Sequence, residues 1–91
     1  MQIRHDVDRH RFLGETPSGT AVLAYAPVGG QALELYSTFV PPAERGRGLG
    51  SQLVQAAVAF AREQGLRIIP TCWYVAAWLG SHPEHGDLVH D

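Results

Sequence analysis

The chain of 91 residues contains no lysine, and all seven of its basic residues are arginine. The absence of lysine excludes Schiff-base chemistry and the P-loop, whose phosphate-binding side chain is a lysine. A single cysteine, Cys72, excludes an internal disulfide and is typical of a reducing compartment. No apolar run approaches the roughly 18 residues of a membrane span, and the N-terminus lacks a signal-peptide pattern. We therefore expect a cytoplasmic protein without membrane contact.

Charge is also scarce, because charged residues make up 18% of the chain and the net charge is −2. Such a balance excludes nucleic-acid binding driven by bulk positive charge. Hydrophobic residues make up 45%, which is an ordinary share for a globular protein. A chain of this length builds one hydrophobic core, so we expect a single domain over residues 1–91.

The first half of the chain alternates apolar and polar residues in the manner of β-strands. Two short strands are expected within residues 2–14, and longer strands over 20–26 and 33–40. Proline and glycine between the longer two predict a hairpin at 27–30. The inward residues predicted for the first two strands are Ile3, Val7, Phe12 and Leu13. These segments predict an antiparallel meander.

From residue 46 onward the apolar residues recur at three- and four-residue steps, which predicts a helix over 46–64 ended by Gly65. Residues 66–70 are short and β-branched and predict a buried strand. Strand, helix and strand across 33–70 predict a right-handed βαβ crossover with parallel pairing. A second helix over 73–80, capped by Thr71 or Cys72, and a tail over 81–89 complete an α+β fold.

A glycine-rich segment, Arg45-Gly46-Arg47-Gly48-Leu49-Gly50, opens the first helix. Its spacing fits neither the P-loop nor the dinucleotide-binding fingerprint. Free backbone amides at a helix N-terminus favour an anion, and Arg45 or Arg47 adds a charge-assisted contact. The segment therefore predicts a phosphate-binding loop. The alternative interpretation is a helix start whose glycines only permit close packing on the sheet.

Cys72 directly precedes the second predicted helix, a position that lowers a thiol pKa and favours the nucleophilic thiolate. Tyr74 follows two residues later, and its hydroxyl is a candidate proton donor toward the same sulfur. The alternative interpretation of Cys72 is a buried structural cysteine. Trp73 and Trp78 are expected to be core aromatics.

Histidine and acidic residues are concentrated near both ends of the chain. The C-terminal set matches no zinc-binding spacing, so no metal site is predicted. Its segment His82-Pro83-Glu84 is interpreted as a cap on the final turn. The N-terminal set is interpreted as a solvated turn. The C-terminal set consists of His82, Glu84, His85, Asp87 and His90, and the N-terminal set of His5, Asp6, Asp8 and His10.

The glycine-rich segment also fits the pattern Arg/Gln-x-x-Gly-x-Gly/Ala through Arg45, Gly48 and Gly50. This is the acetyl-CoA pyrophosphate loop of GNAT-type N-acetyltransferases. The segments 70–75 and 82–84 extend the match. Over most of residues 20–89 the chain resembles the short, single-domain GNAT-like N-acetyltransferases, which carry a Pro-x-Cys-x-Tyr segment and a His-Pro-Glu tail.

The resemblance implies a truncated GNAT fold, with a mostly antiparallel sheet, one βαβ crossover and a C-terminal helix. It implies acetyl-CoA as cofactor and places Cys72 where the acetyl thioester comes to rest. Family members commonly carry tyrosine and histidine at the positions of His85 and Ser37, which argues against a strand-end histidine base here. The residues expected to bind the cofactor are Phe39, Val40, Arg45, Gly46, Arg47, Gly48, Leu49 and Gly50.

We therefore expect acetyl transfer from acetyl-CoA to an amine. Either Cys72 takes the acetyl group first, or the amine attacks directly while Cys72 or Tyr74 reprotonates the leaving thiolate. A non-catalytic CoA-binding module that acts with a partner protein is the alternative, and a small interaction domain without a cofactor is a third. The sequence identifies no acceptor amine and leaves a homodimer open.

Overall fold

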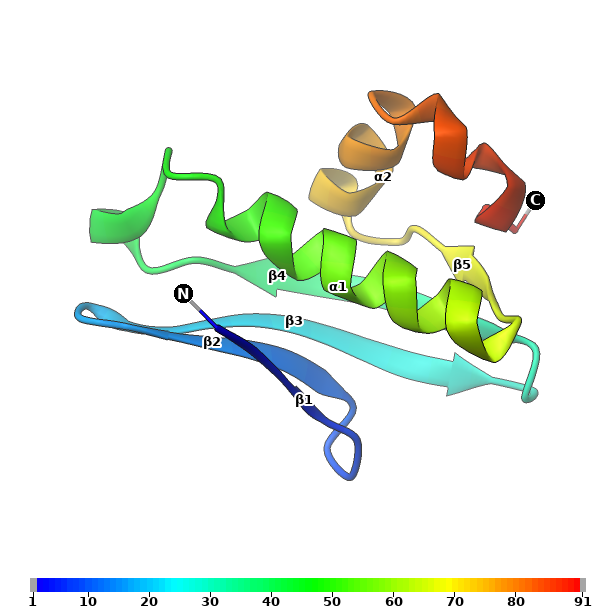
Figure 1. Ribbon diagram of the computed structural model, residues 1–91, viewed down its shortest axis with the longest axis horizontal. Coiled ribbons are helices and arrows are strands. Elements are labelled where there is room, and N and C mark those ends of the chain that lie inside the picture. The colour runs from blue at the N-terminus through cyan, green and yellow to red at the C-terminus, as the bar shows by residue number, and fades with distance from the viewer. Residues whose placement is uncertain (1, 91) are drawn as a thin grey trace.

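The computed structural model describes residues 2–90, in which a five-stranded sheet packs against two α-helices and two short 3-10 helices (Figure 1). The strands follow one another in both chain and spatial order: β1 (Ile3–Asp6), β2 (Arg11–Thr16), β3 (Gly19–Val28), β4 (Ala32–Phe39) and β5 (Arg67–Ile69). The helices are η1 (Pro42–Glu44), α1 (Leu49–Gln64), α2 (Trp73–Gly80) and η2 (Pro83–Leu88).

The sheet confirms the predicted α+β fold. β1 to β4 pair antiparallel, and β5 pairs parallel to β4 after the crossover through α1. The parallel pairing is short, because only residues 32–34 of β4 meet 67–69 of β5. Beyond that point one further backbone hydrogen bond joins β4 to the segment after β5 within the described residues, from the Cys72 N–H to the Leu35 carbonyl at 2.9 Å. Within residues 2–90, the edge of β4 from Tyr36 onward therefore has no strand partner on this side.

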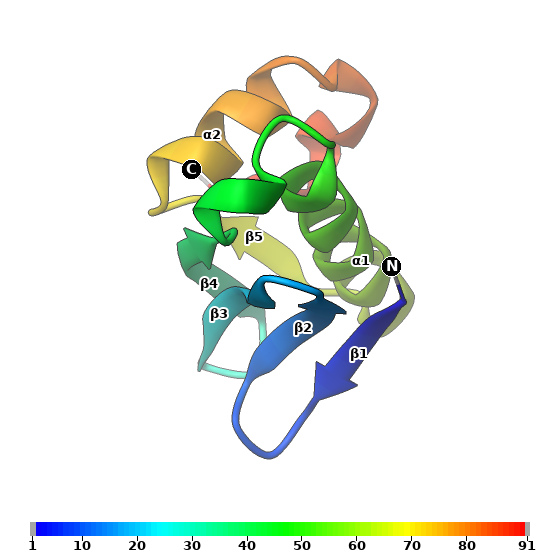
Figure 2. The same ribbon diagram turned by 90° about the vertical axis from the view of Figure 1, so that its left-hand side faces the viewer.

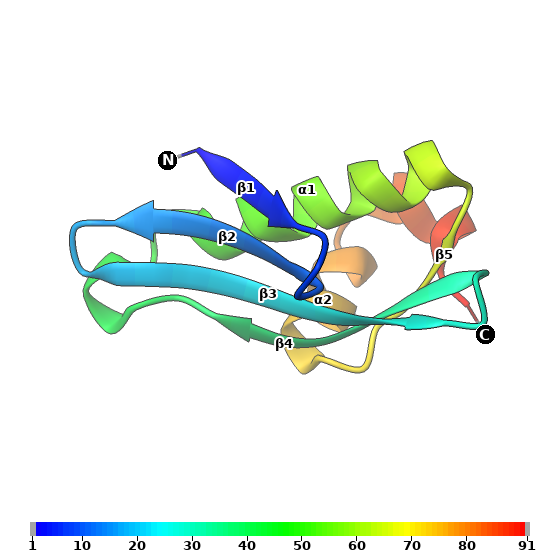
Figure 3. The ribbon, with the colours of Figure 1, turned by 90° about the horizontal axis from the view of Figure 1, so that it is seen from below.

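Helix α1 crosses one face of the sheet, and its predicted apolar stripe forms the centre of the core. Both α-helices lie on this side, and Figure 3 shows the strands in front of them when the molecule is viewed from below. The end view in Figure 2 shows α2 beside α1, above β4 and β5. The residues of α1 that are buried are Leu49, Gly50, Leu53, Val54, Ala57, Val58 and Ala61.

The start of α1 differs from the prediction, because the helix begins at Leu49 and not at residue 46. Gly46 and Gly48 have φ angles of 83° and 79°. Residues other than glycine rarely adopt these left-handed conformations, and they do not continue a right-handed helix. These two glycines therefore shape the turn that leads into the helix.

Helix α2 packs against α1 and β4, and η2 packs against α1 and α2. The Trp78 indole N–H donates to the Ser51 hydroxyl at 2.8 Å, which ties α2 to the first turn of α1. Arg62 on α1 holds Asp87 through two N–H···O bonds of 3.0 and 3.1 Å. Among the described residues, no helix is both long enough and apolar enough to cross a membrane.

Two predictions about the N-terminal segment are wrong. Val7 was expected to point inward, but it lies in the turn between β1 and β2 and is 58% exposed. His5 was expected in a solvated turn, but it lies in β1. Its ring stacks on that of Phe12, with 4.1 Å between the ring centroids, and packs edge-on against Phe60, with 4.4 Å between the centroids. Strand alternation directs His5 inward, so it becomes part of an aromatic cluster between the sheet and α1.

The His5 ring also hydrogen-bonds through Nε2 to the Tyr25 hydroxyl at 2.6 Å. Burial raises the pKa of Tyr25, aided by the charge of Asp6, so the hydroxyl keeps its proton and can donate to a neutral imidazole. Burial likewise lowers the pKa of His5, an effect that Asp6 opposes and His10 reinforces. The folded state therefore favours uncharged His5.

We expect the free energy of unfolding to fall more steeply from about pH 7 to about pH 5 in the natural protein than in His5→Gln. The folded-state pKa of His5 lies below the unfolded value of about 6.5, so the unfolded state binds more protons. The stabilising contribution of neutral His5 is therefore fully present above that pH, and it is lost as the pH falls toward the folded-state pKa. Urea unfolding across this range measures the slope, with His90→Gln as an exposed control. Equal slopes for His5→Gln and the natural protein would contradict this assignment.

Candidate functional site

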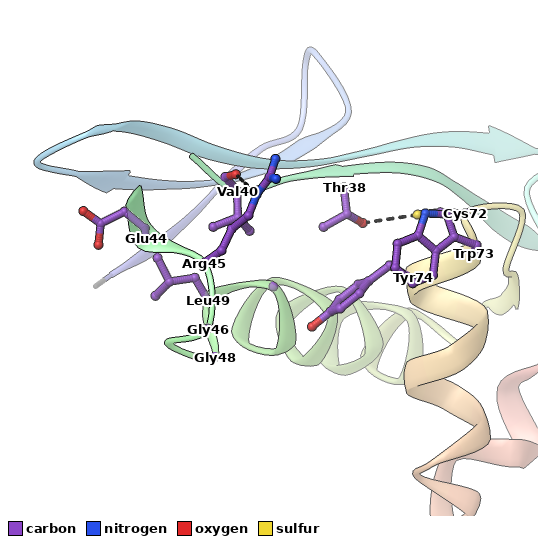
Figure 4. A pocket seen from close by; sticks show the side chains of 11 residues that line it. Thr38, Val40, Glu44, Arg45, Gly46, Gly48, Leu49, Cys72, Trp73 and Tyr74 are labelled. Carbon is purple, nitrogen blue, oxygen red and sulfur yellow. Dashed lines mark hydrogen bonds between the residues drawn. The ribbon is translucent and has the colours of Figure 1, made fainter. Parts of the chain in front are cut away.

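A cavity of about 650 Å³ lies between the free edge of β4, the start of α1 and the start of α2 (Figure 4). It brings together the glycine-rich segment and Cys72, which are more than 20 positions apart in the chain. Its lining residues are Thr38, Val40, Glu44, Arg45, Gly46, Gly48, Leu49, Gly50, Cys72, Trp73 and Tyr74. Most residues singled out from the sequence therefore share one site.

At the loop end of the cavity, the N-terminus of α1 has no side-chain cap. Gly48 is the N-cap residue and carries no side chain that could accept from the first helical amides. Because these N–H groups have no partner within the helix, they and the helix dipole form an attractive site for an anion. A Cβ atom added to Gly46 or Gly48 would have no heavy atom within 4 Å apart from its own residue and its chain neighbours, so both glycines face open space.

The arginines of the segment have separate contacts. Arg45 donates from Nε to the Val40 carbonyl at 3.0 Å, which fixes the exit from β4. Arg47 lies 3.7 Å from Glu44, whose buried carboxylate also accepts a hydrogen bond from Ser18. Sequence reasoning missed Glu44, although a carboxylate one residue before the arginine motif is a visible signal. Its charge sits beside the anion site and is partly offset by Arg47.

At the other end of the cavity, Cys72 is the N-cap residue of α2, as predicted. Its sulfur lies 3.6 Å from the Thr38 hydroxyl on β4. Burial acts to raise the pKa of the Cys72 thiol, but hydrogen bonds from the Val75 backbone, the Thr38 side chain, and the Tyr74 and Thr38 backbones outweigh it. The net pKa is lowered, so the surroundings stabilise a thiolate. Thr38 is a second residue that sequence reasoning missed.

Tyr74 lies across the middle of the cavity and packs on the first turn of α1. A Cβ atom added to Gly50 would lie 2.8 Å from the Tyr74 hydroxyl oxygen and 2.9 Å from the adjoining ring carbon. In Figure 4 the Tyr74 hydroxyl points toward α1, whereas the Cys72 sulfur points toward Thr38. The glycine at position 50 therefore permits the close approach of α2 to α1.

Other predicted residues lie at the margins of the site. Trp73 was expected in the core, but it is 79% exposed and forms part of the cavity wall. Phe39 is 48% exposed, and neither Phe39 nor Arg47 is among the lining residues. His82 stacks on Trp78 and hydrogen-bonds its carbonyl at 2.6 Å. No group of three or more metal-ligating side chains occurs within residues 2–90.

Comparison with known proteins identifies the family. The model of the GCN5-related N-acetyl-transferase family matches residues 11–88. The chain belongs to this family. Three similar proteins are each named Protein NATD1. The Gallus gallus protein is 36% identical over 92 residues, covering 99% of this chain and 84% of its own length.

The other two relatives come from mammals. The Bos taurus protein is 36% identical and the Homo sapiens protein 35% identical, each over 85 residues that cover 91% of this chain and 75% of the relative. These matches confirm the predicted short GNAT-like family and, with the observed sheet and crossover, the truncated GNAT-like fold. The family is described as one of N-acetyl-transferases.

We expect Gly50→Ala to destabilise the natural protein but to stabilise a Tyr74→Ala variant. Alanine inside a helix is favoured over glycine by roughly 0.5–1 kcal/mol, whereas overpacking against Tyr74 destabilises by about 1–3 kcal/mol. Urea unfolding of both single variants and the double variant gives the coupling free energy. Additive effects would show that Tyr74 does not occupy this contact.

Proposed function

We propose that the protein transfers an acetyl group from acetyl-CoA to an amine, and that the thioester lies beside Cys72. One observation carries this proposal: a helix N-terminus without a side-chain cap and a thiol with lowered pKa open into the same cavity. The first is suited to the pyrophosphate of CoA, and the second to chemistry on its thioester. Family membership supports the pairing of these two features.

The lining residues fit such a cofactor. The backbone amides at the start of α1 and the guanidinium of Arg45 would hold the pyrophosphate. The edge of β4 around Phe39 and Val40 has no strand partner on the cavity side within the described residues. Its backbone groups, apart from the Val40 carbonyl held by Arg45, are available to the amides of the pantetheine arm. Gly46, Gly48 and Gly50 leave room for the phosphates, and Leu49 contributes apolar wall. Acetyl-CoA supplies the activated acetyl group.

In the two-step mechanism the Cys72 thiolate attacks the thioester carbonyl. A bond forms between that carbon and the Cys72 sulfur, and CoA leaves as a thiolate that takes a proton. An amine then attacks acetyl-Cys72, the carbon–sulfur bond breaks, and the amine proton passes to solvent. Hydrogen bonds from Thr38, Tyr74 and Val75 stabilise the Cys72 thiolate both as nucleophile and as leaving group.

In the one-step mechanism the amine attacks acetyl-CoA directly, and the leaving thiolate takes a proton from the protein. Cys72 and Tyr74 are the lining residues with an S–H or phenolic O–H. The lowered pKa of Cys72 suits nucleophilic attack better, because it raises the fraction of thiolate, which is the nucleophilic form. We therefore assign nucleophilic attack to Cys72 and keep Tyr74 as the candidate proton donor to departing CoA.

A CoA-binding module without catalysis is the competing function. The buried Glu44 carboxylate near the anion site and the short sheet are compatible with weak binding completed by a partner protein. Both functions require CoA binding. They differ when acetyl-CoA and amines are supplied, because only an enzyme then releases the free thiol of CoA.

We expect CoA to raise the melting temperature of the natural protein and of Arg9→Ala, and to do so much less for Arg45→Ala. Arg9 is a matched control, because it is an exposed arginine in the turn between β1 and β2, outside the residues that line the cavity. Loss of one charge-assisted contact to phosphate weakens binding by about 1.5–3 kcal/mol. Identical shifts in all three proteins would refute the phosphate assignment.

A further inference from the structure

One carboxylate close to Cys72 is held by a neighbouring hydroxyl group. Glu34 on β4 accepts a hydrogen bond from the Thr71 hydroxyl at 2.7 Å. It takes part in none of the ion pairs formed by the described side chains. Arg67, which shares its face of the sheet, donates instead to the Val89 carbonyl at 3.2 Å. Glu34 therefore holds an uncompensated negative charge, oriented by a hydroxyl group.

Glu34 lies close to Cys72 through two connections. Thr71, which binds the carboxylate, precedes Cys72 in the chain, and Leu35, which follows Glu34, accepts the Cys72 N–H at 2.9 Å. The alternation of β4 buries Leu35 and turns Glu34 to the opposite face, away from α1. The carboxylate thus lies on the face of β4 opposite to α1 and outside the residues that line the cavity, so a group bound to it would not occupy the space assigned to CoA.

Two exposed aromatic side chains flank the same junction. Tyr36 directly follows Leu35, and Trp73 directly follows Cys72, the two residues that the backbone hydrogen bond joins. Tyr36 is 51% exposed and Trp73 is 79% exposed. Trp73 lines the cavity and Tyr36 does not, and both exposed rings are available to a ligand at this junction. Aromatic faces attract alkylammonium groups. A carboxylate with aromatic neighbours is therefore suited to an organic cation.

The two ends of the site differ in charge. Arg45 and Arg47 lie at the loop end, where the phosphates of CoA would bind, and the residues lining the Cys72 end include no basic side chain. An amine must lose its proton to attack an acyl group, so the charge that Glu34 recognises must belong to a second ammonium of the same molecule.

We propose that the acceptor is a small diamine or polyamine, whose second ammonium binds at Glu34 between Tyr36 and Trp73. This inference rests on the proposed acetyl transfer. Glu34 is a recognition group and takes no part in bond making. Its removal is expected to weaken binding and raise KM for the diamine while leaving kcat unchanged.

Titration calorimetry on the CoA complex tests the inference with putrescine and with 1,4-butanediol, which has the same carbon chain and carries no ammonium. Putrescine is expected to bind about fivefold more tightly than 1,4-butanediol, a preference that one partly exposed charge pair supplies. Glu34→Gln keeps an acceptor for Thr71 and should abolish the preference. Trp73→Leu should weaken putrescine binding about threefold. Glu63→Gln, an exposed site on α1, is the control and should keep the preference.

Equal binding of the two compounds to the natural protein, or an undiminished preference in Glu34→Gln, would overturn the inference. Release of CoA thiol from acetyl-CoA is measured in parallel for putrescine and for n-butylamine, whose single amine must lie at the thioester to react. A Glu34-dependent preference without thiol release would sustain the amine subsite and refute the proposed transfer. Thiol release at equal kcat/KM for both amines would sustain the transfer and overturn the subsite.

Discussion

The close contact between Tyr74 and Gly50 is the constraint on which the candidate site depends. It sets the first turn of α2 against the first turn of α1, and the bond from Trp78 to Ser51 holds the same pair of helices one turn further along α2. The Cys72 N–H fixes the other side of α2 to β4. Because one helix start carries the uncapped amides and the other carries the thiol, this packing joins both in one cavity.

The polarity of the cavity follows from the same geometry. At the loop end, free amides and Arg45 favour negative charge, and the buried carboxylate of Glu44 is held by Ser18 and Arg47. At the far end, backbone N–H groups favour the thiolate of Cys72. Such fixed dipoles need no reorganisation when charge develops on sulfur, which is the main electrostatic advantage of a preformed site.

Sequence reasoning recovered the order of the strands and helices and the parallel crossover, because glycine spacing and apolar periodicity are local signals. It did not recover the helix start at Leu49, which depends on backbone angles, or the roles of Thr38 and Glu44, which depend on strands meeting a distant segment. The inward position of His5 and the exposure of Trp73 were likewise decided by tertiary packing.

The central claim is that the acetyl group passes through Cys72, and intact-protein mass spectrometry tests it most directly. The natural protein is mixed with acetyl-CoA without an amine, quenched, and digested to locate any modification. We predict one acetyl group on the peptide that contains Cys72, none in Cys72→Ala, and its loss when an acceptor amine is added. Full amine acetylation by Cys72→Ala, with no acetylated intermediate in the natural protein, would contradict the claim.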